Sequence, residues 1–168
     1  MDVKKFINNA KKGGKDLWIL NFLFGRGIPF NAPHRVKVLE VTDTSIKARF
    51  PYIRKNLNHV KGLHACGLAA LSEFTAGTTL MSRIDFKQYR LIMSELKMEY
   101  FYQGKSDAIA EYSASDEWIS TNIITPLETQ DSVYVECAVK VHDVQGNHLC
   151  TGTSKWQLKR WDKVKTKM

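Results

Sequence analysis

Cysteine is scarce in this chain, and neither cysteine nor histidine occurs at the spacings that form disulfide frameworks or metal sites. The three cysteines, Cys66, Cys137 and Cys150, are odd in number and lie far apart without a CxxC pair. A disulfide framework and a zinc site are therefore not predicted, and a reducing cytoplasm suits the chain. The sequence also has no glycine-rich phosphate loop, so we expect neither a bound metal nor a resident cofactor.

No apolar run is both long enough and free enough of charge to predict a membrane span. Residues 17–24 read LWILNFLF after a lysine-rich start, but Arg26 and Pro29 follow, without a small-residue cleavage site. Residues 63–82 approach the length of a spanning helix, yet they include Glu73 and several threonines. We expect a cytoplasmic protein without stable membrane insertion.

Acidic residues are fewer than basic ones, which leaves a net charge of +8 on 168 residues. The basic residues gather at the two ends, in the clusters Lys4, Lys5, Lys11, Lys12 and Lys15, and Lys155, Lys159, Arg160, Lys163, Lys165 and Lys167. Such ends can attract nucleic acid or acidic lipid. Charge runs are more often solvated surfaces, so we expect no nucleic-acid partner.

Hydrophobic periodicity predicts one domain preceded by a short helical arm. Two helices, over residues 3–10 and 16–24, are separated by Gly13-Gly14, a pair that is costly inside a helix. They form an N-terminal helical arm over residues 1–28, ahead of a domain over residues 29–168. The apolar residues of the arm must either pack on the domain or touch a membrane surface, and the short polar face favours packing.

Beyond the arm, period-two alternation predicts a hairpin over residues 35–50, and a long nonpolar helix follows at residues 65–82. Further strands are predicted at residues 89–102, 107–114, 133–141 and 148–160. Gly104-Lys105 and Gly146-Asn147 are predicted to turn these strands into two pairs, with Ser115 capping a helix between them. A helix without a charged face must be covered on most sides, so we predict an α+β fold with an antiparallel sheet wrapped around it.

Glu73 is the single charged residue of the stretch ACGLAALSEFTAGTTLMS, residues 65–82. An unpaired carboxylate in such surroundings is destabilising, or its pKa rises until it is neutral. A buried hydrogen bond, a salt bridge or a solvated helix edge can compensate it. Alternatively, Glu73 is a general base or nucleophile held in a dry pocket.

The residues ahead of this helix favour the catalytic interpretation. At the predicted helix N-terminus the backbone N–H groups of Ala65, Cys66 and Gly67 have no helical acceptors and can polarise a carbonyl oxygen. These amide donors, together with Asn58, His64 and a downstream carboxylate, are the parts of an acyl-transfer site.

Asn58, then His64 six residues later, then Glu73 nine residues beyond resemble the motif of hotdog-fold thioesterases of the phenylacetyl-CoA type. In that motif Asn…His-Gly-Gly precedes a helix that carries an acid. The order of hairpin, central helix and four strands is also similar, so the resemblance covers residues 30–160. It is closest to a largely uncharacterised branch that has His-Ala in place of His-Gly. The resemblance implies a hotdog fold, hydrolysis of an acyl-CoA thioester, and a catalytic site of Asn58, His64, Glu73 and the amides of residues 65–67.

The chain departs from that motif in two places. The two glycines are replaced by Ala65 and Cys66, whose Cβ atoms can restrict how closely a thioester approaches the amides, and Gly62 sits one place later than the usual loop glycine. A second function therefore stays open, that of a non-catalytic hotdog protein that binds an acyl chain or acyl-CoA.

Helix geometry adds an expectation about assembly. At about 1.5 Å per residue, Glu73 stands about 12–13 Å along the axis from the start of the helix. One chain cannot easily bring both ends to one carbon atom. We therefore predict a homodimer, or a tetramer built from it, in which Glu73 of one subunit lies beside the amides of residues 65–67 of the other.

Basic residues are needed for the phosphates of coenzyme A, which enters as part of the substrate. Arg83, Lys87 and Arg90 follow the helix and are the predicted partners, with Lys61 as a weaker one. Trp18, Phe22 and Phe24 of the arm are candidates for a lid over the acyl group.

Two further functions are less favoured, that of a dehydratase and that of a binder of nucleic acid or membrane surfaces. His59 lies 14 residues before Glu73, which resembles the loop histidine and helix acid of hotdog dehydratases, but the prolines usual in that loop are missing. The basic ends, in which Lys155-Trp156 and Arg160-Trp161 place aromatic residues beside basic ones, leave open a protein that binds nucleic acid or a membrane surface.

Overall fold

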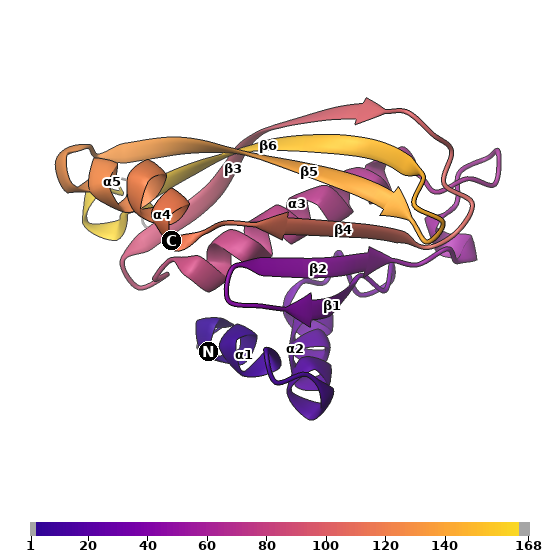
Figure 1. The fold of residues 1–168 in the computed structure, drawn as a ribbon, viewed down its shortest axis with the longest axis horizontal. Helices are drawn as coiled ribbons and strands as arrows, with labels where there is room; N and C mark the ends of the chain where they lie inside the picture. The colour runs from indigo at the N-terminus through magenta and orange to yellow at the C-terminus, as the bar shows by residue number, and fades with distance from the viewer. Residues whose placement is uncertain (1–2, 165–168) are drawn as a thin grey trace.

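Alternating apolar residues build one antiparallel sheet of six strands, which curves around a single long helix (Figure 1). The computed structural model describes residues 3–164, so Lys165 and Lys167 of the basic C-terminal cluster lie outside the described residues. The helices and helical turns are α1 Val3–Ala10, α2 Gly14–Gly27, η1 Arg54–Asn56, α3 Ala65–Arg83, α4 Asp116–Ile119, η2 Ser120–Ile124, α5 Thr125–Thr129 and η3 Trp161–Lys163. The strands are β1 Lys37–Val41, β2 Ser45–Phe50, β3 Tyr89–Tyr100, β4 Ala108–Ser113, β5 Ser132–Asp143 and β6 His148–Arg160. The predicted antiparallel sheet around a central helix is confirmed.

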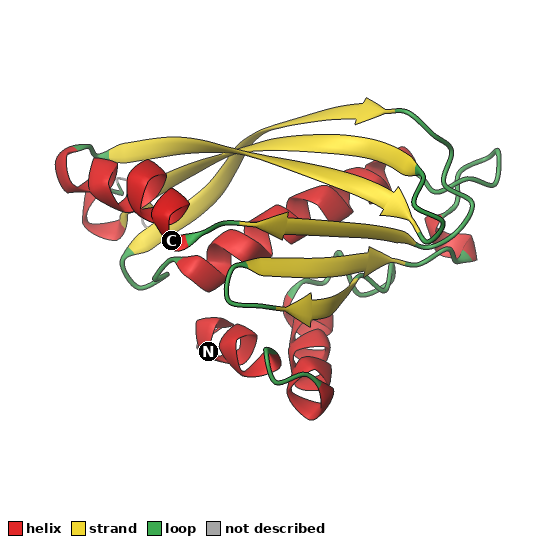
Figure 2. Ribbon diagram, in the orientation of Figure 1, coloured by secondary structure: helices red, strands yellow, loops and turns green. Residues whose placement is uncertain are grey.

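The strands follow the order β1-β2-β4-β5-β6-β3, and every neighbouring pair is antiparallel. Two predicted hairpins, β1 with β2 and β5 with β6, are confirmed; the second turns at Gly146, whose φ of 88° favours glycine. Ser115 caps α4 as predicted, since its side chain accepts a hydrogen bond from the Trp118 N–H. Figure 2 shows α3 along one face of the sheet, while α4 and α5 gather at one end.

The predicted hairpin between residues 89–102 and 107–114 is wrong. β3 pairs with β6, whereas β4 lies between β2 and β5, so the connection through Gly104 crosses the sheet instead of folding back. Gly104 is buried, and its carbonyl accepts a hydrogen bond of 2.8 Å from the Leu63 N–H. A Cβ there would lie 3.0 Å from Leu149 and 3.1 Å from Leu63. This glycine therefore serves a close crossing, which local turn chemistry does not distinguish from a hairpin.

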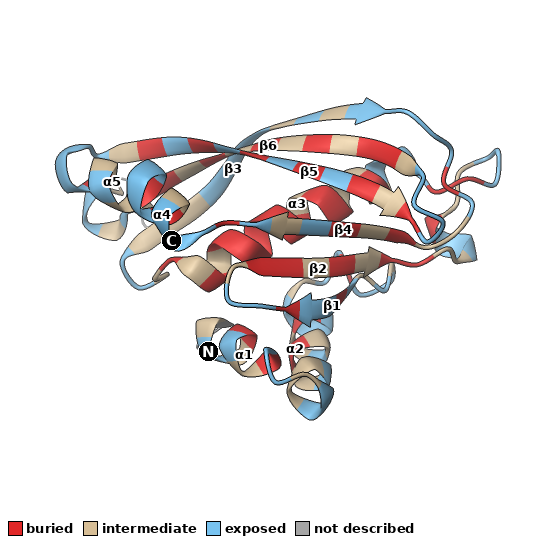
Figure 3. Ribbon diagram, in the orientation of Figure 1, coloured by how far each residue is buried: buried red, intermediate tan, exposed pale blue. Residues whose placement is uncertain are grey.

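Glycine positions allow the sheet to approach α3 closely. A Cβ on Gly67 of the helix would lie 2.3 Å from the ring of Phe50, a fully buried residue of β2. A Cβ on Gly152 of β6 would lie 2.6 Å from the Cβ of Ser72 on the helix. Most side chains of α3 from Leu68 to Leu80 are buried in consequence (Figure 3).

The arm is fastened to the domain through one side of α2. Leu20 and Phe24 are buried, and the ring of Phe24 meets the ring of Phe74 edge to face at 5.5 Å between centroids. The Asn21 side chain donates to the Val38 carbonyl at 2.9 Å and accepts from the Val38 N–H at 2.8 Å. Phe24 is thus a core residue, which contradicts its predicted role in a lid.

We expect Gly152→Ala to lower the free energy of unfolding by about 1–3 kcal/mol, because the added methyl group overpacks a contact that has no room for it. Urea denaturation measures this change. Gly25→Ala in α2 is the matched control, since nothing lies within 4 Å of its Cβ position, and alanine is the better helix former. Equal stabilities of Gly152→Ala and the unaltered protein would contradict the close contact.

Candidate functional site

Glu73 lies in the middle of α3, and its side chain is half-buried. A Cβ on Gly77 would lie 3.7 Å from Glu73 Oε1 and 2.8 Å from Trp156 Cη2, so the carboxylate lies close to the indole of Trp156. That indole donates its N–H to Ser154 Oγ at 2.8 Å rather than to the carboxylate. Within residues 3–164, no side chain or backbone group forms a hydrogen bond or ion pair with Glu73. A compensating partner, one of the alternatives left open by the sequence, is therefore not found in the described part of one chain.

Burial raises the pKa of Glu73 above its ordinary value of 4.5, because the enclosed site favours the uncharged acid over the carboxylate. Raised pKa values in partly enclosed clefts are typical of functional acids and bases. Once ionised, such a carboxylate is a stronger base than an exposed one.

Glu73→Gln tests this burial through the pH dependence of stability. Between pH 4.5 and the raised pKa the folded protein binds more protons than the unfolded chain, so Glu73 makes unfolding easier as pH rises. The stability of Glu73→Gln relative to the unaltered protein should therefore increase with pH across that window and then level off. Denaturant unfolding at several pH values measures it. A difference between the two proteins that stays flat across this range of pH would contradict the burial of Glu73.

The N-terminal turn of α3 offers one free amide rather than three. His64 is the N-cap, and its Nδ1 accepts a hydrogen bond of 3.1 Å from the Cys66 N–H. The His64 carbonyl accepts from the Gly67 N–H at 2.9 Å. Among the described residues the Ala65 N–H has no acceptor, so the predicted donor set narrows to Ala65. Because Nδ1 accepts, the ring proton of His64 lies on Nε2.

Asn58 closes the loop that leads into α3. Its Oδ1 accepts from the Gly62 N–H at 2.9 Å and from the Val60 N–H at 3.1 Å. Its backbone N–H donates to the Gly62 carbonyl at 2.8 Å, and Lys61 between them has a positive φ of 60°. Asn58 Nδ2 also donates to the Leu63 carbonyl at 3.5 Å, one residue before the N-cap of α3, so the side chain of Asn58 positions the loop that leads into the helix.

A mostly apolar pocket of about 280 Å³ lies beside the start of α3. Its walls come from three separate segments, with Phe30, His34, Phe50, His64, Cys66 and Ala70 among the lining residues. Within its lining, the side-chain oxygen of the buried Asn56 accepts a hydrogen bond from His34 Nδ1 at 2.9 Å, and Asn56 Nδ2 donates to the His34 carbonyl at 3.0 Å. The sequence interpretation missed His34 and Asn56, since no local pattern shows that residues 22 positions apart meet.

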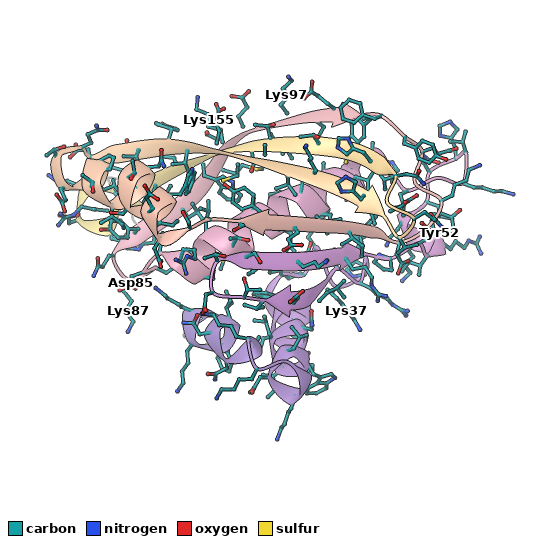
Figure 4. All side chains as sticks on the ribbon, in the orientation of Figure 1. Lys37, Tyr52, Asp85, Lys87, Lys97 and Lys155 are labelled. Carbon is teal, nitrogen blue, oxygen red and sulfur yellow. The ribbon has the colours of Figure 1, made fainter. Side chains whose placement is uncertain are left out.

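The basic residues predicted for coenzyme A are not gathered at one place. Arg83 forms an ion pair with Asp116 and also donates to the Asp43 carbonyl. Arg90 donates to Gln157 at 3.2 Å. Lys87 lies at the opposite end of the molecule from Tyr52 (Figure 4).

Lys61 alone of the four lies near the N-terminal end of α3. The hydroxyl of Tyr52 donates to its backbone carbonyl at 2.6 Å, and its side chain is exposed. Ala65 and Arg83, by contrast, are separated by about 27 Å along a helix of this length. In one chain, therefore, Lys61 alone among the predicted four could serve a ligand at the Ala65 amide.

One side of α3 is left open by the sheet. Cys66, Ala70 and Glu73 follow one another at helical spacings of four and three residues, so they share a face, and none of the three is buried. Next to this face runs β3, whose second edge has no strand partner in residues 3–164. The side chains of Ile92 and Met93 on β3 are exposed. The other edge strand, β1, bonds Asn21 of α2 through the Val38 backbone. The open helix face and the β3 edge are therefore surfaces that could receive a second chain.

A sheet in this strand order, wrapped around a helix that carries an acid, defines the hotdog fold, and solved structures agree. Protein PA5026 of Pseudomonas aeruginosa, described as a probable thioesterase of unknown function, matches with a TM-score of 0.78 and 19% identity over 84% of this chain and 95% of that one. A mutant of thioesterase PA1618 from the same organism matches with a TM-score of 0.68 and 14% identity, over 90% of this chain and 99% of that one. Thioesterase HI1161 of Haemophilus influenzae matches with a TM-score of 0.66 and 10% identity, over 86% of this chain and 90% of that one. Because the sequence identities are below 20%, the structural likeness establishes the fold alone.

The chain belongs to the family described as Domain of unknown function (DUF4442), whose model matches residues 17–158. No curated protein matches its sequence. Among the helices of residues 3–164, none is long and apolar enough to cross a membrane.

Proposed function

We propose that the protein is an acyl-CoA thioesterase that hydrolyses a coenzyme A thioester at the interface of a homodimer. The observation that carries this proposal is the half-buried carboxylate of Glu73, whose pKa is raised and for which residues 3–164 supply no partner. It lies on the same open face of α3 as the N-terminal turn of that helix. The thioesterases among the solved hotdog structures give it further support.

In this mechanism the thioester carbonyl oxygen accepts a hydrogen bond from the Ala65 N–H, which stabilises the negative charge that develops there. Glu73 of the second subunit takes a proton from a water molecule, and the water oxygen adds to the carbonyl carbon. The tetrahedral intermediate then collapses, the carbon–sulfur bond breaks, and the proton on Glu73 passes to the departing thiolate. Direct attack by the Glu73 carboxylate, through an anhydride, is the alternative route.

Two subunits are needed because Glu73 and Ala65 are separated by about 12 Å along one helix. Antiparallel packing of two α3 helices across their open faces would bring each Glu73 toward the Ala65 of the other chain. The small residues Cys66 and Ala70 on that face permit a close approach, and pairing of the two β3 edges would extend the sheet. His64 and Asn58 then act as positioning residues, which hold the turn that carries Ala65.

A non-catalytic acyl-CoA binding protein is the second candidate. It is favoured by the hydrogen bond between the Cys66 N–H and His64, because only one backbone donor remains for an oxyanion. In that case Glu73 would line a binding site without taking part in a reaction.

A panel of short, long and aromatic acyl-CoAs, assayed by detection of free thiol, distinguishes the two candidates. We expect hydrolysis by the unaltered protein and a loss of at least about 100-fold in kcat/KM for Glu73→Gln, the usual range for removing a general base. Glu136→Gln should keep full activity. Absence of hydrolysis for every thioester, with retained binding, would leave the second candidate.

The shared site makes a sharper prediction through mixed dimers. Ala65 is the first residue of α3, where proline is compatible with a helix, and His64 before it has the extended conformation that proline requires (φ −68°, ψ 133°). Ala65→Pro therefore removes the donor while keeping the helix, and should inactivate the protein as Glu73→Gln does.

When the two inactive variants are unfolded and refolded together in equal amounts, about half of the dimers should contain one of each chain. Each mixed dimer has one intact site of two, so about a quarter of the original activity should return. Measured activity that stays at the level of the separate variants would show that both groups act within one chain, or that neither acts as proposed.

A further inference from the structure

An aromatic pair projects from the outer face of α2. The rings of Trp18 and Phe22 are stacked at 5.7 Å between centroids, with 13° between their planes. Their exposed fractions are 66% and 54%. Because one side of α2 already supplies Leu20 and Phe24 to the core, this pair is not needed to close the core.

The same face of α2 carries positive charge at both ends of the pair. Lys15 precedes Trp18 by three residues and Arg26 follows Phe22 by four, so all four share one helix face, and all are exposed. Asp16, the one acidic residue of α2, falls about 100° round the helix from Lys15. Over residues 3–28 there are six basic residues and one acidic residue. One of the six, Lys11, is paired with Asp43, and the arm as a whole keeps a net positive charge.

The arm holds this face firmly. The two hydrogen bonds between Asn21 and the backbone of Val38 fasten α2 to the edge of the sheet. Phe24 packs against Phe74 of α3. Figure 1 shows the arm on the side of β1 that is remote from β4, β5 and β6, where it projects from the domain.

We propose that this face, Lys15, Trp18, Phe22 and Arg26, docks the protein on the surface of a membrane that contains anionic lipid. Tryptophan and phenylalanine lie at the boundary between head groups and acyl chains, while lysine and arginine beside them contact the lipid phosphates. The docking is peripheral and involves no membrane span. It goes beyond the proposed thioesterase activity, which assigns no step to a residue of α2, and it replaces the lid role expected of Trp18 and Phe22.

Area and charge favour a lipid surface over a protein partner. Two aromatic side chains of about 150–250 Å² each cannot supply the roughly 800 Å² per partner that a stable protein interface takes. Aromatic side chains flanked by basic ones are typical of membrane-surface helices.

The full-length protein should sediment with vesicles of phosphatidylcholine that contain about 30% phosphatidylglycerol, and less so as salt screens the charges. It should bind pure phosphatidylcholine vesicles much more weakly. Trp18→Ser with Phe22→Ser should weaken binding at least about tenfold. Lys15→Gln with Arg26→Gln should weaken it about 25-fold, since each charge near an anionic surface contributes about fivefold.

Tyr134→Ser and Lys140→Gln are matched controls, since both residues are exposed on β5, on the sheet rather than the arm. They should leave vesicle binding unchanged. Circular dichroism and thermal melting establish that every variant is folded. Equal binding to both kinds of vesicle, or no binding, would overturn the proposal. So would unchanged binding by the aromatic double variant, or a change in its subunit number in sedimentation, which would assign the face to contact between copies of the chain.

Discussion

Close contact between α3 and the curved sheet is the constraint from which the other features of the structure follow. The helix can approach β2 because Gly67 leaves space for the ring of Phe50, and it can approach β6 because Gly152 leaves space for Ser72. Interiors of proteins are packed at the density of organic crystals, so a single methyl group at either place would separate the two layers. With one side of α3 held against the sheet in this way, the rotation of the helix is set, and the side with Cys66, Ala70 and Glu73 must face outward.

That rotation explains how a carboxylate is tolerated in a nearly uncharged helix. Glu73 lies neither in the core proper nor in open water, but beside Gly77 and the indole of Trp156, where burial raises its pKa. The helix also separates the acid from the donor amide of Ala65 by a fixed rise per residue. In the proposed mechanism a second copy of the chain therefore supplies the complementary half of each site.

The two sides of α2 differ in burial. Alternate sides of α2 meet different surroundings, because residues three or four apart share a face. Leu20 and Phe24 contribute to the core, whereas Trp18 and Phe22 remain in solvent as a stacked pair. The sequence pattern alone shows only that the arm is apolar. It does not show that the apolar residues divide between the core and the surface, which explains why the lid prediction for Phe24 was wrong.

Local patterns determined most of the secondary structure of this protein. Period-two alternation identified the strands and the hairpin over residues 35–50, the nonpolar run identified α3, and Gly146-Asn147 identified the hairpin between β5 and β6, because these signals depend on near neighbours in the chain. The motif of Asn58, His64 and Glu73 likewise pointed to the hotdog fold. Only the tertiary structure decided that Gly104 marks a crossing, that Arg83 is bound to Asp116, and that His34 meets Asn56. It also decided that Asn58 closes its own loop and that, of the three amides predicted as donors, Ala65 holds the free one. These outcomes depend on residues brought together from distant parts of the chain or on hydrogen bonds in competition, and neither is encoded in spacing along the sequence.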